Sequence, residues 1–200
     1  TVSAGVVTRC QSCDCTSLES VIHLGFHPLC NSLRPVNEPS RPFTTYPLEL
    51  LRCPKCTLVQ LGYIVASEEL FGVSYPYTSS TTRILRENFA DLRAELGLFL
   101  GEKDLIVDIG GNDGNLLSNF TATCKTLNVT PEDMGKLGEE RGIPHLQMYW
   151  GKDAAKQVVT KHGKAKVITA TNVFAHVPDC HEFLDAALDA ALNNGVRTAQ

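Results

Sequence analysis

The second half of the chain alternates between short apolar runs and amphipathic segments. The apolar runs predict strands at DLIVDIG (104–110), TLNV (126–129), HLQMYW (145–150) and KVITATNV (166–173). Helical spacing predicts helices at 114–124, 132–142, 153–163 and 180–195. Such alternation with short turns is typical of a parallel sheet covered by helices on both faces. VRTAQ (196–200) is expected to begin one more strand.

A connector at 61–82 precedes the clearest helical pattern, ILRENFADLRAELGLFL (84–100). Apolar residues recur there at spacings of four, three and four, which places them on one helix face. These residues are Leu85, Phe89, Leu92 and Leu96. The Ser-Ser-Thr-Thr run just before this helix is expected to supply oxygens that cap its free N–H groups.

The first 60 residues have a different pattern. Prolines at 28, 35, 39, 42, 47 and 54 exclude long helices, and only 21–26 and 57–61 favour extended structure. A module of this size buries little apolar surface, so a metal would have to hold it together. We therefore expect a small module at 1–60, a connector and helix at 61–103, and an incomplete, doubly wound α/β domain at 104–200.

Charge and hydropathy exclude two kinds of partner. The net charge is −4, and acidic and basic residues are interspersed without a basic stripe, so neither nucleic acid nor an anionic membrane is expected as a partner. No apolar run approaches the ~20 residues of a membrane span, so no membrane insertion is expected. The chain begins at Thr1, as expected if an initiator or a targeting segment was removed or the chain was trimmed.

The cysteines indicate a metal site. Six of the eight lie in the first 56 residues, and four form two CxxC pairs, which favours a metal site in a reducing compartment over disulfides. Two such pairs complete a tetrahedral zinc site with no open position for water or substrate, so a structural role is expected. The predicted ligands are Cys10, Cys13, Cys53 and Cys56.

Other assignments of these residues stay open. The two pairs could instead be unmetallated redox pairs or disulfides. One ligand could be replaced by Cys15, His23 or His27. The remaining cysteines at 30, 124 and 180 are expected to be buried thiols.

The stretch VDIGGNDG (107–114) predicts a ligand-binding turn. Asp108 ends a strand, and the glycines at 110, 111 and 114 let the backbone turn sharply and approach a ligand. Asn112 tolerates left-handed conformations better than most residues. The lysine of a phosphate loop and the GxGxxG dinucleotide fingerprint are both absent. An acid before such a turn suits an amine-bearing cation, and S-adenosylmethionine carries both an amino group and a sulfonium.

Several stretches together indicate a family. The CxxC pair, LGFHPLCNSL, FTTYPLELLRCPKCTLVQL, SYPYTSS, VDIGGNDG and ATNVFAHVPD occur in this order. In this combination the chain resembles the S-adenosylmethionine-dependent C-methyltransferases of nucleotide-linked deoxysugars. The resemblance covers nearly the whole chain. It implies a zinc-binding domain, then a Rossmann-like methyltransferase domain, then a C-terminal domain that is expected beyond Gln200.

The resemblance also implies roles for particular residues. The glycine turn would hold the methionyl end of the cofactor through Asp108, Gly110, Gly111, Asn112, Asp113 and Gly114. The tyrosine segment and the histidine after the fourth strand would face the transfer site, as Tyr75, Tyr77 and His176. The alternative for the tyrosines is aromatic packing under a connector, and the alternative for His176 is a core histidine.

Two departures from the family pattern lower the expected activity. The acid that usually ends the second strand and holds the cofactor ribose is replaced by Thr130, and Glu132 and Asp133 are expected to point at the ribose less directly. Binding of S-adenosylmethionine is therefore expected to be weak or lost. The resembling enzymes are also longer, and their general base for C-methylation is expected beyond Gln200, although His176 could serve.

Two functions are consistent with these patterns. The first is a methyltransferase-like, zinc-containing subunit of a larger assembly, non-catalytic by itself, with a location in the mitochondrial matrix. The second is the N-terminal part of an active C-methyltransferase in the cytoplasm, with a nucleotide-linked sugar as partner. These patterns favour the first, with protein subunits expected to cover the open sheet edge near 166–200.

Overall fold

The computed structural model describes residues 4–191, which form two compact units. Of the described residues, the N-terminal unit holds those up to Leu70 together with Pro178–His181, and the C-terminal unit holds Phe71–Val177 and 182–191. Within the N-terminal unit, Gln11 Nε2 donates to the Pro178 carbonyl at 3.1 Å. The two units are described separately below.

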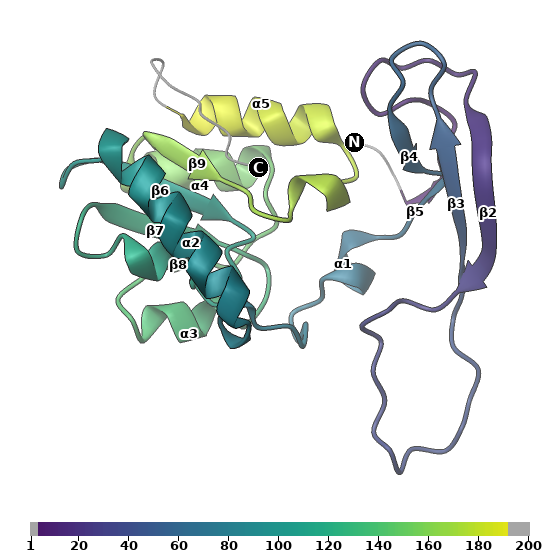
Figure 1. The fold of residues 1–200 in the computed structure, drawn as a ribbon, viewed down its shortest axis with the longest axis horizontal. Helices are drawn as coiled ribbons and strands as arrows, with labels where there is room; N and C mark the ends of the chain where they lie inside the picture. The colour runs from purple at the N-terminus through teal and green to yellow at the C-terminus, as the bar shows by residue number, and fades with distance from the viewer. Residues whose placement is uncertain (1–3, 192–200) are drawn as a thin grey trace. The chain divides into compact units, whose positions relative to one another are not determined.

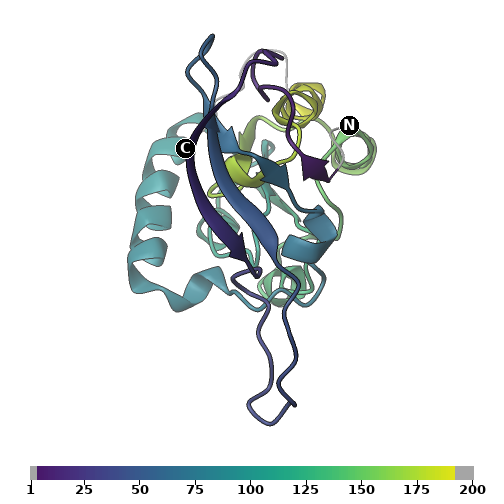
Figure 2. The ribbon, with the colours of Figure 1, turned by 90° about the vertical axis from the view of Figure 1, so that its right-hand side faces the viewer.

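The N-terminal unit consists of short antiparallel pairings. Its elements are β1 (Gly5–Val6), β2 (Glu19–His27), β3 (Tyr46–Arg52), β4 (Val59–Leu61), β5 (Tyr63–Ile64) and α1 (Ser67–Leu70). One sheet has the order β2-β3-β4, and its long strands β2 and β3 run side by side in Figure 2. Strand β1 pairs with β5. A long loop, residues 28–45, joins β2 to β3 (Figure 1). The expected extended segments are present, whereas β3 lies in a proline-containing stretch that the sequence pattern did not single out.

Burial in the N-terminal unit is slight. Among the described residues of 4–70, the buried ones are Cys10, Cys53, Gln60 and Gly62. The nine-residue strand β2 is exposed along most of its length. This confirms the expectation that the module has almost no apolar core of its own.

The C-terminal unit contains a four-stranded parallel sheet. Its strands are β6 (Leu105–Ile109), β7 (Lys125–Val129), β8 (His145–Leu146) and β9 (Val167–Thr169), in the order β8-β7-β6-β9. Its helices are α2 (Arg83–Leu96), α3 (Gly135–Glu139), α4 (Lys152–His162) and α5 (Cys180–Ala190), the last of which begins in the N-terminal unit. Strands β7 and β8 are added on one side of β6, and β9 is added on its other side, so a topological switch point lies between β6 and β9.

Two apolar clusters cover the two faces of this sheet. Alternate residues of β6, such as Val107 and Ile109, pack with α4 and α5, whereas Ile106 packs with α2 and with Phe120. In Figure 1, α2 crosses in front of the sheet and α4 lies behind it. The predicted doubly wound α/β fold is confirmed.

Several predicted elements are shorter in the structure. The helix expected at 114–124 is a series of turns with one 3-10 turn, η3 (Leu117–Asn119). The side chains of Ser118 and Asn119 donate to the Asn115 carbonyl there, at 2.7 and 3.1 Å, and such bonds compete with a regular helix. Strand β8 keeps two residues of the segment expected at 145–150, and α3 keeps five of 132–142.

Three further expectations concern the ends of elements. Thr82 is the N-cap of α2 but makes no side-chain capping bond, so the predicted capping role is wrong. Helix α2 ends at Leu96 and a 3-10 turn, η2 (Gly97–Phe99), follows it. The strand expected at 196–200 lies outside the described residues. None of the described helices is long and apolar enough to cross a membrane.

Candidate functional site

The four predicted zinc ligands form one cluster. The sulfur atoms of Cys10, Cys13, Cys53 and Cys56 all lie within 4.8 Å of one another. The Cys10–Cys56 and Cys13–Cys53 Sγ pairs are 3.4 and 3.6 Å apart. Zinc–sulfur bonds of about 2.3 Å in a tetrahedron place sulfurs about 3.8 Å apart, so the cluster fits one zinc ion.

The two CxxC turns have the same backbone geometry. The N–H of Asp14 donates to the Cys10 carbonyl, and the N–H of Thr57 donates to the Cys53 carbonyl, each at 3.0 Å. Both Asp14 and Thr57 have a positive φ, 57° and 65°. Each turn therefore presents its two sulfurs in the same way, which is what a four-cysteine site built from two equivalent halves requires.

The thiols of this cluster differ in acidity. Backbone N–H donors, first that of Cys56, lower the pKa of Cys53 to about 6. The backbone N–H of Cys15 favours the Cys13 thiolate, but burial and the neighbouring sulfurs outweigh it and raise that pKa to about 12. Four sulfurs this close cannot all ionise without a cation, which is consistent with a metal site.

The remaining candidate thiols and imidazoles lie elsewhere. Among the described residues, Cys15, His23 and His27 are not part of the four-sulfur cluster. Cys124 is buried as expected, and burial raises the pKa of its thiol. Cys180 is only partly buried, and Cys30 is exposed, so the prediction of a buried thiol is wrong at Cys30.

The glycine turn follows the carboxyl end of β6. Gly110 and Gly114 have φ of +65° and +75°, and Asn112 is also left-handed at 51°. A Cβ on Gly110 would lie 2.5 Å from Cγ2 of Val173. Gly110 is therefore needed for close packing against the loop after β9, in addition to its positive φ.

Asp108 lies at the centre of the sheet next to this turn. It is 1% exposed, and its Oδ1 accepts a hydrogen bond of 2.7 Å from Thr169 on β9. Burial raises the pKa of Asp108 to about 7, although the Thr169 bond acts in the opposite direction. On the other side Asp108 is paired in register with Asn128 of β7. The structure thus places an acid with a near-neutral pKa at the predicted cofactor turn.

The side chains of Asn112 and Asp113 point to the connector before α2. Asn112 accepts from the N–H of Ser79 at 3.0 Å and donates to the Tyr77 carbonyl at 3.0 Å. Asp113 accepts from Ser79 Oγ at 2.5 Å and lies 3.5 Å from Arg141. Burial would raise the pKa of Asp113, but the serine donors and Arg141 hold it below its ordinary value. These two side chains fix the connector against the turn.

Glu132 folds back toward the carboxyl end of β7. Its Oε2 accepts hydrogen bonds from Thr130 Oγ1 at 3.0 Å and from Asn112 Nδ2 at 3.3 Å. The residue is 6% exposed, and burial raises its pKa more than these two donors lower it. Glu132 thus brings a carboxylate to the strand end where Thr130 replaces the expected acid.

The structure brings two of the three predicted catalytic residues to one aromatic group. The Phe71 ring lies 5.4 Å from the Tyr75 ring and 5.7 Å from the His176 ring, measured between centroids. His176 is exposed, so it is not a core histidine. Tyr77 is 45% exposed and contributes its backbone carbonyl to Asn112. No sequence signal singled out Phe71.

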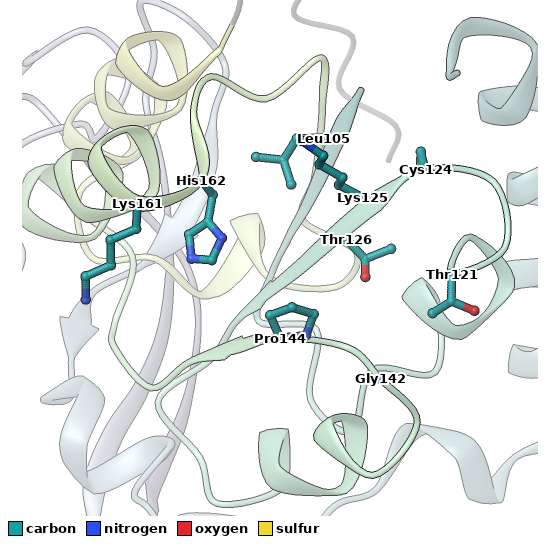
Figure 3. Close-up of a pocket in the computed structure, with 9 residues that line it drawn as sticks. All are labelled: Leu105, Thr121, Cys124, Lys125, Thr126, Gly142, Pro144, Lys161 and His162. Atoms are coloured by element: carbon teal, nitrogen blue, oxygen red, sulfur yellow. The ribbon is translucent and has the colours of Figure 1, made fainter. Parts of the chain in front are cut away.

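A surface pocket of about 370 Å³ lies at the amino-terminal ends of the central strands. Leu105 and Lys125, the first residues of β6 and β7, line it together with Thr126, Pro144 and His162 (Figure 3). The glycine turn follows the other end of β6, so this pocket is distinct from the candidate cofactor site.

Two family models match consecutive parts of the chain. Residues 10–71 match the family described as "Putative zinc binding domain", and residues 82–197 match the family described as "Methyltransferase domain". The C-methyltransferase NovU of Streptomyces niveus is 28% identical over 185 residues, which are 90% of this chain and 43% of NovU. The chain therefore spans less than half the length of this relative.

Solved methyltransferase structures resemble parts of the chain. The plantazolicin methyltransferase BpumL in complex with SAH matches with a TM-score of 0.45 and 15% identity, over 56% of this chain and 46% of BpumL. A SAM-dependent methyltransferase from Thiobacillus denitrificans, in complex with S-adenosyl-L-homocysteine, gives 0.44 and 14%, over 56% and 47%. Likeness at this level does not assign an activity.

The match at 82–197 covers more than half of the chain and includes the sheet, the glycine turn and the loop with His176. The zinc-binding match covers all four clustered cysteines. This chain belongs to the methyltransferase-domain family and carries a four-cysteine zinc-binding domain ahead of its methyltransferase domain.

Proposed function

We propose that this chain is the N-terminal part of an S-adenosylmethionine-dependent C-methyltransferase that acts on a nucleotide-linked deoxysugar. The motif order and the similarity to the C-methyltransferase NovU support the reaction class. The position of Glu132 supports retained cofactor binding. The alternative of a non-catalytic mitochondrial subunit gains no support from the site or from the comparisons.

The residues at the carboxyl ends of the strands suit this cofactor. Asp108 is the next-to-last residue of β6, and Glu132 follows β7, the adjacent strand. The two acids could therefore serve neighbouring positions of one ligand. Bound S-adenosylmethionine would supply an electrophilic methyl group. Asp108 would balance the charge of its amino group, and the left-handed turn at Gly110 lets the backbone approach the ligand closely.

Glu132 is the observation that carries this proposal. One of its carboxylate oxygens is held by Thr130 and Asn112. Within the described part of the chain, no hydrogen bond to its other oxygen is recorded, so that oxygen is available for the hydroxyls of a ribose. Hydrogen bonds to a charged group are worth about 1.5–3 kcal/mol each. Glu132 would therefore restore much of the affinity that an acid in place of Thr130 would supply.

The residues near His176 suit the proton transfer that C-methylation requires. A carbon nucleophile forms when a proton is removed next to a carbonyl or its equivalent, and this needs a positioned base. His176 is exposed in the 3-10 turn η4 (Phe174–His176), and its ring lies beside Phe71, whose ring also lies beside that of Tyr75. In our proposal His176 holds or moves this proton, and Tyr75 orients the sugar.

The test is calorimetric binding of S-adenosylhomocysteine to the zinc-loaded chain. Wild-type protein should bind one equivalent, and Glu132→Gln should weaken binding at least ~10-fold, the effect of about 1.4 kcal/mol. The matched control is Asp133→Asn, because Asp133 is exposed and pairs with Lys136 instead. Its affinity should equal that of wild type.

Two results would count against the proposal. No heat of binding from well-folded, zinc-loaded wild-type protein would remove the basis for a cofactor-dependent function. Equal loss of affinity in Glu132→Gln and Asp133→Asn would show that Glu132 has no special contact with the ligand.

A further inference from the structure

Three polar side chains form a row across the buried centre of the sheet. Asp108 of β6 is paired in register with Asn128 of β7 and with Thr169 of β9. None of the three is more than 1% exposed. Polar residues inside parallel strands need partners, because water does not reach them. The row therefore has to satisfy its own hydrogen bonds.

One oxygen of this row lacks a donor. Asn128 uses its Nδ2 to donate to the Asn112 carbonyl at 2.9 Å. Its Oδ1 is buried and has no hydrogen-bond partner in the described part of the chain. A buried amide oxygen without a donor is unfavourable, and most such atoms in folded proteins are paired. A donor for Asn128 Oδ1 is therefore expected close by.

Asp108 can supply this donor. Its Oδ1 is engaged by Thr169, and its Oδ2 faces the same space beside Gly111 as the unpaired oxygen of Asn128. A Cβ added to Gly111 would lie 2.7 Å from Asp108 Oδ2 and 2.6 Å from Asn128 Oδ1. Two acceptor oxygens that converge on one space repel each other, unless one of them carries a proton.

We infer that Asp108 is a neutral carboxylic acid in the free chain, with its proton on the oxygen that faces Asn128, and that it ionises when an amine-bearing cation docks at the glycine turn. The proton passes to solvent as the acid becomes a carboxylate, and the cation then balances the new negative charge. Asn128 and Thr169 are positioning residues in this scheme, because they act through Asp108. The second half of the inference rests on the proposed function.

The electrostatic surroundings of Asp108 agree with this scheme. Burial raises the pKa of Asp108, and among the described residues the one opposing influence is the hydrogen bond from Thr169. The acids of the turn and of the β7 end have other partners: Asp113 bonds to Ser79 and Arg141, and Glu132 bonds to Thr130. No charged side chain of the described residues contributes to the shift.

The first test needs no ligand. Carboxyl-carbon NMR of the free, zinc-loaded chain should show one aspartate that titrates close to pH 7, assigned by its absence in Asp108→Asn. Asn128→Ala removes the acceptor and should lower this titration point by about one pH unit, the equivalent of one hydrogen bond. Thr169→Val removes the donor to the opposite oxygen and should raise it.

The opposite signs of these two variants separate a specific row from general damage to the fold. An Asp108 that is already ionised at pH 5 in the free wild-type chain would overturn the inference. So would a titration point that moves in the same direction in Asn128→Ala and Thr169→Val.

The second test measures protons. Calorimetry of S-adenosylhomocysteine binding at pH 6, in buffers of different ionisation enthalpy, should show release of about one proton per ligand bound. Binding without proton release would overturn the ligand-linked half of the inference. Absence of any binding would defeat the proposed function and that half together, while the titration of the free chain would still decide the protonation of Asp108.

Discussion

The two units of this chain are stabilised in different ways. In the C-terminal unit, two clusters of buried apolar side chains cover the two faces of the parallel sheet. In the N-terminal unit, two of the four buried residues in the described part of 4–70 are the metal-site cysteines Cys10 and Cys53. The comparison indicates that one unit folds through apolar burial, whereas the other depends on a bound metal.

Loss of zinc should produce the largest difference in stability between the two units. Chelation or Cys53→Ser should unfold the first 60 residues, because structural zinc supplies most of the stability of such a module. The sheet of the C-terminal unit should stay folded. Residue-resolved hydrogen exchange, combined with metal analysis that shows one zinc per chain, measures both parts of this expectation.

Cys30→Ser is the matched control for this experiment, because Cys30 is exposed and lies outside the cluster. It should keep the zinc and the protection of the N-terminal unit. Fresh, reduced protein without zinc, or a Cys53→Ser variant with full protection of residues 4–60, would contradict the difference between the units.

A cavity in the core of the C-terminal unit should have the next largest effect. Phe120 is fully buried, and Phe120→Ala should lower the free energy of unfolding of this unit by about 3–5 kcal/mol. Phe26→Ala in the exposed strand β2 is the control and should change stability by less than about 0.5 kcal/mol. Denaturant unfolding, followed separately for each unit, gives both values, and equal losses would argue against a core confined to the C-terminal unit.

A change of pH should alter the free energy of unfolding of the two units in opposite directions. The folded pKa of Asp108 is about 7 and its ordinary value is 3.8, so the folded state binds the extra proton between these values. The free energy of unfolding of the C-terminal unit should therefore fall as pH rises through this window, by at most about 1.4 kcal/mol per pH unit. Zinc binding requires thiolates, so the N-terminal unit should instead lose stability as pH falls.

Asp108→Asn tests this pH dependence, because it keeps the shape of the side chain without a titrating proton. Thermal or chemical unfolding between pH 4 and 7 should give a flatter profile for this variant than for wild type. An unchanged slope in Asp108→Asn would mean that another group carries the dependence.

A glycine pair gives a smaller and sharper test within the C-terminal unit. Gly110 and Gly142 both have a positive φ, of 65° and 78°, but only Gly110 is crowded, by Val173. Gly142→Ala should cost about 1 kcal/mol for the left-handed backbone alone, and Gly110→Ala should cost about 1–3 kcal/mol more, as overpacking does. Adding Val173→Ala should recover part of the loss at Gly110 and none at Gly142, which a double-mutant cycle measures.

The sequence predicted the features that depend on local spacing. Two CxxC pairs predicted the cluster of Cys10, Cys13, Cys53 and Cys56, because each pair brings its own sulfurs together. Alternating strand and helix patterns predicted a parallel sheet with helices on both faces. Each of these signals is contained in a short segment, so it can be recognised without knowledge of the fold.

The sequence could not predict the contacts that depend on distant segments. Ser79 and Ser80 bond to Asp113 instead of capping α2, and no local rule distinguishes these two uses of a serine. The approach of Phe71 to His176 likewise needs the complete fold. Asn128 was a missed signal, because a polar amide inside an apolar strand indicates a buried hydrogen-bond row.

The most direct test of the account is NMR mapping of S-adenosylhomocysteine onto the zinc-loaded chain. The amide signals of 108–114, Thr130 and Glu132 should shift, and those of the zinc turns at 10–15 and 55–58 should stay in place. The shifts should be absent in a chain that carries Glu132→Gln and Asp108→Asn together. Unchanged signals at 108–114 in a large excess of ligand, or shifts confined to the pocket at Lys125 and His162, would contradict a cofactor site at the glycine turn.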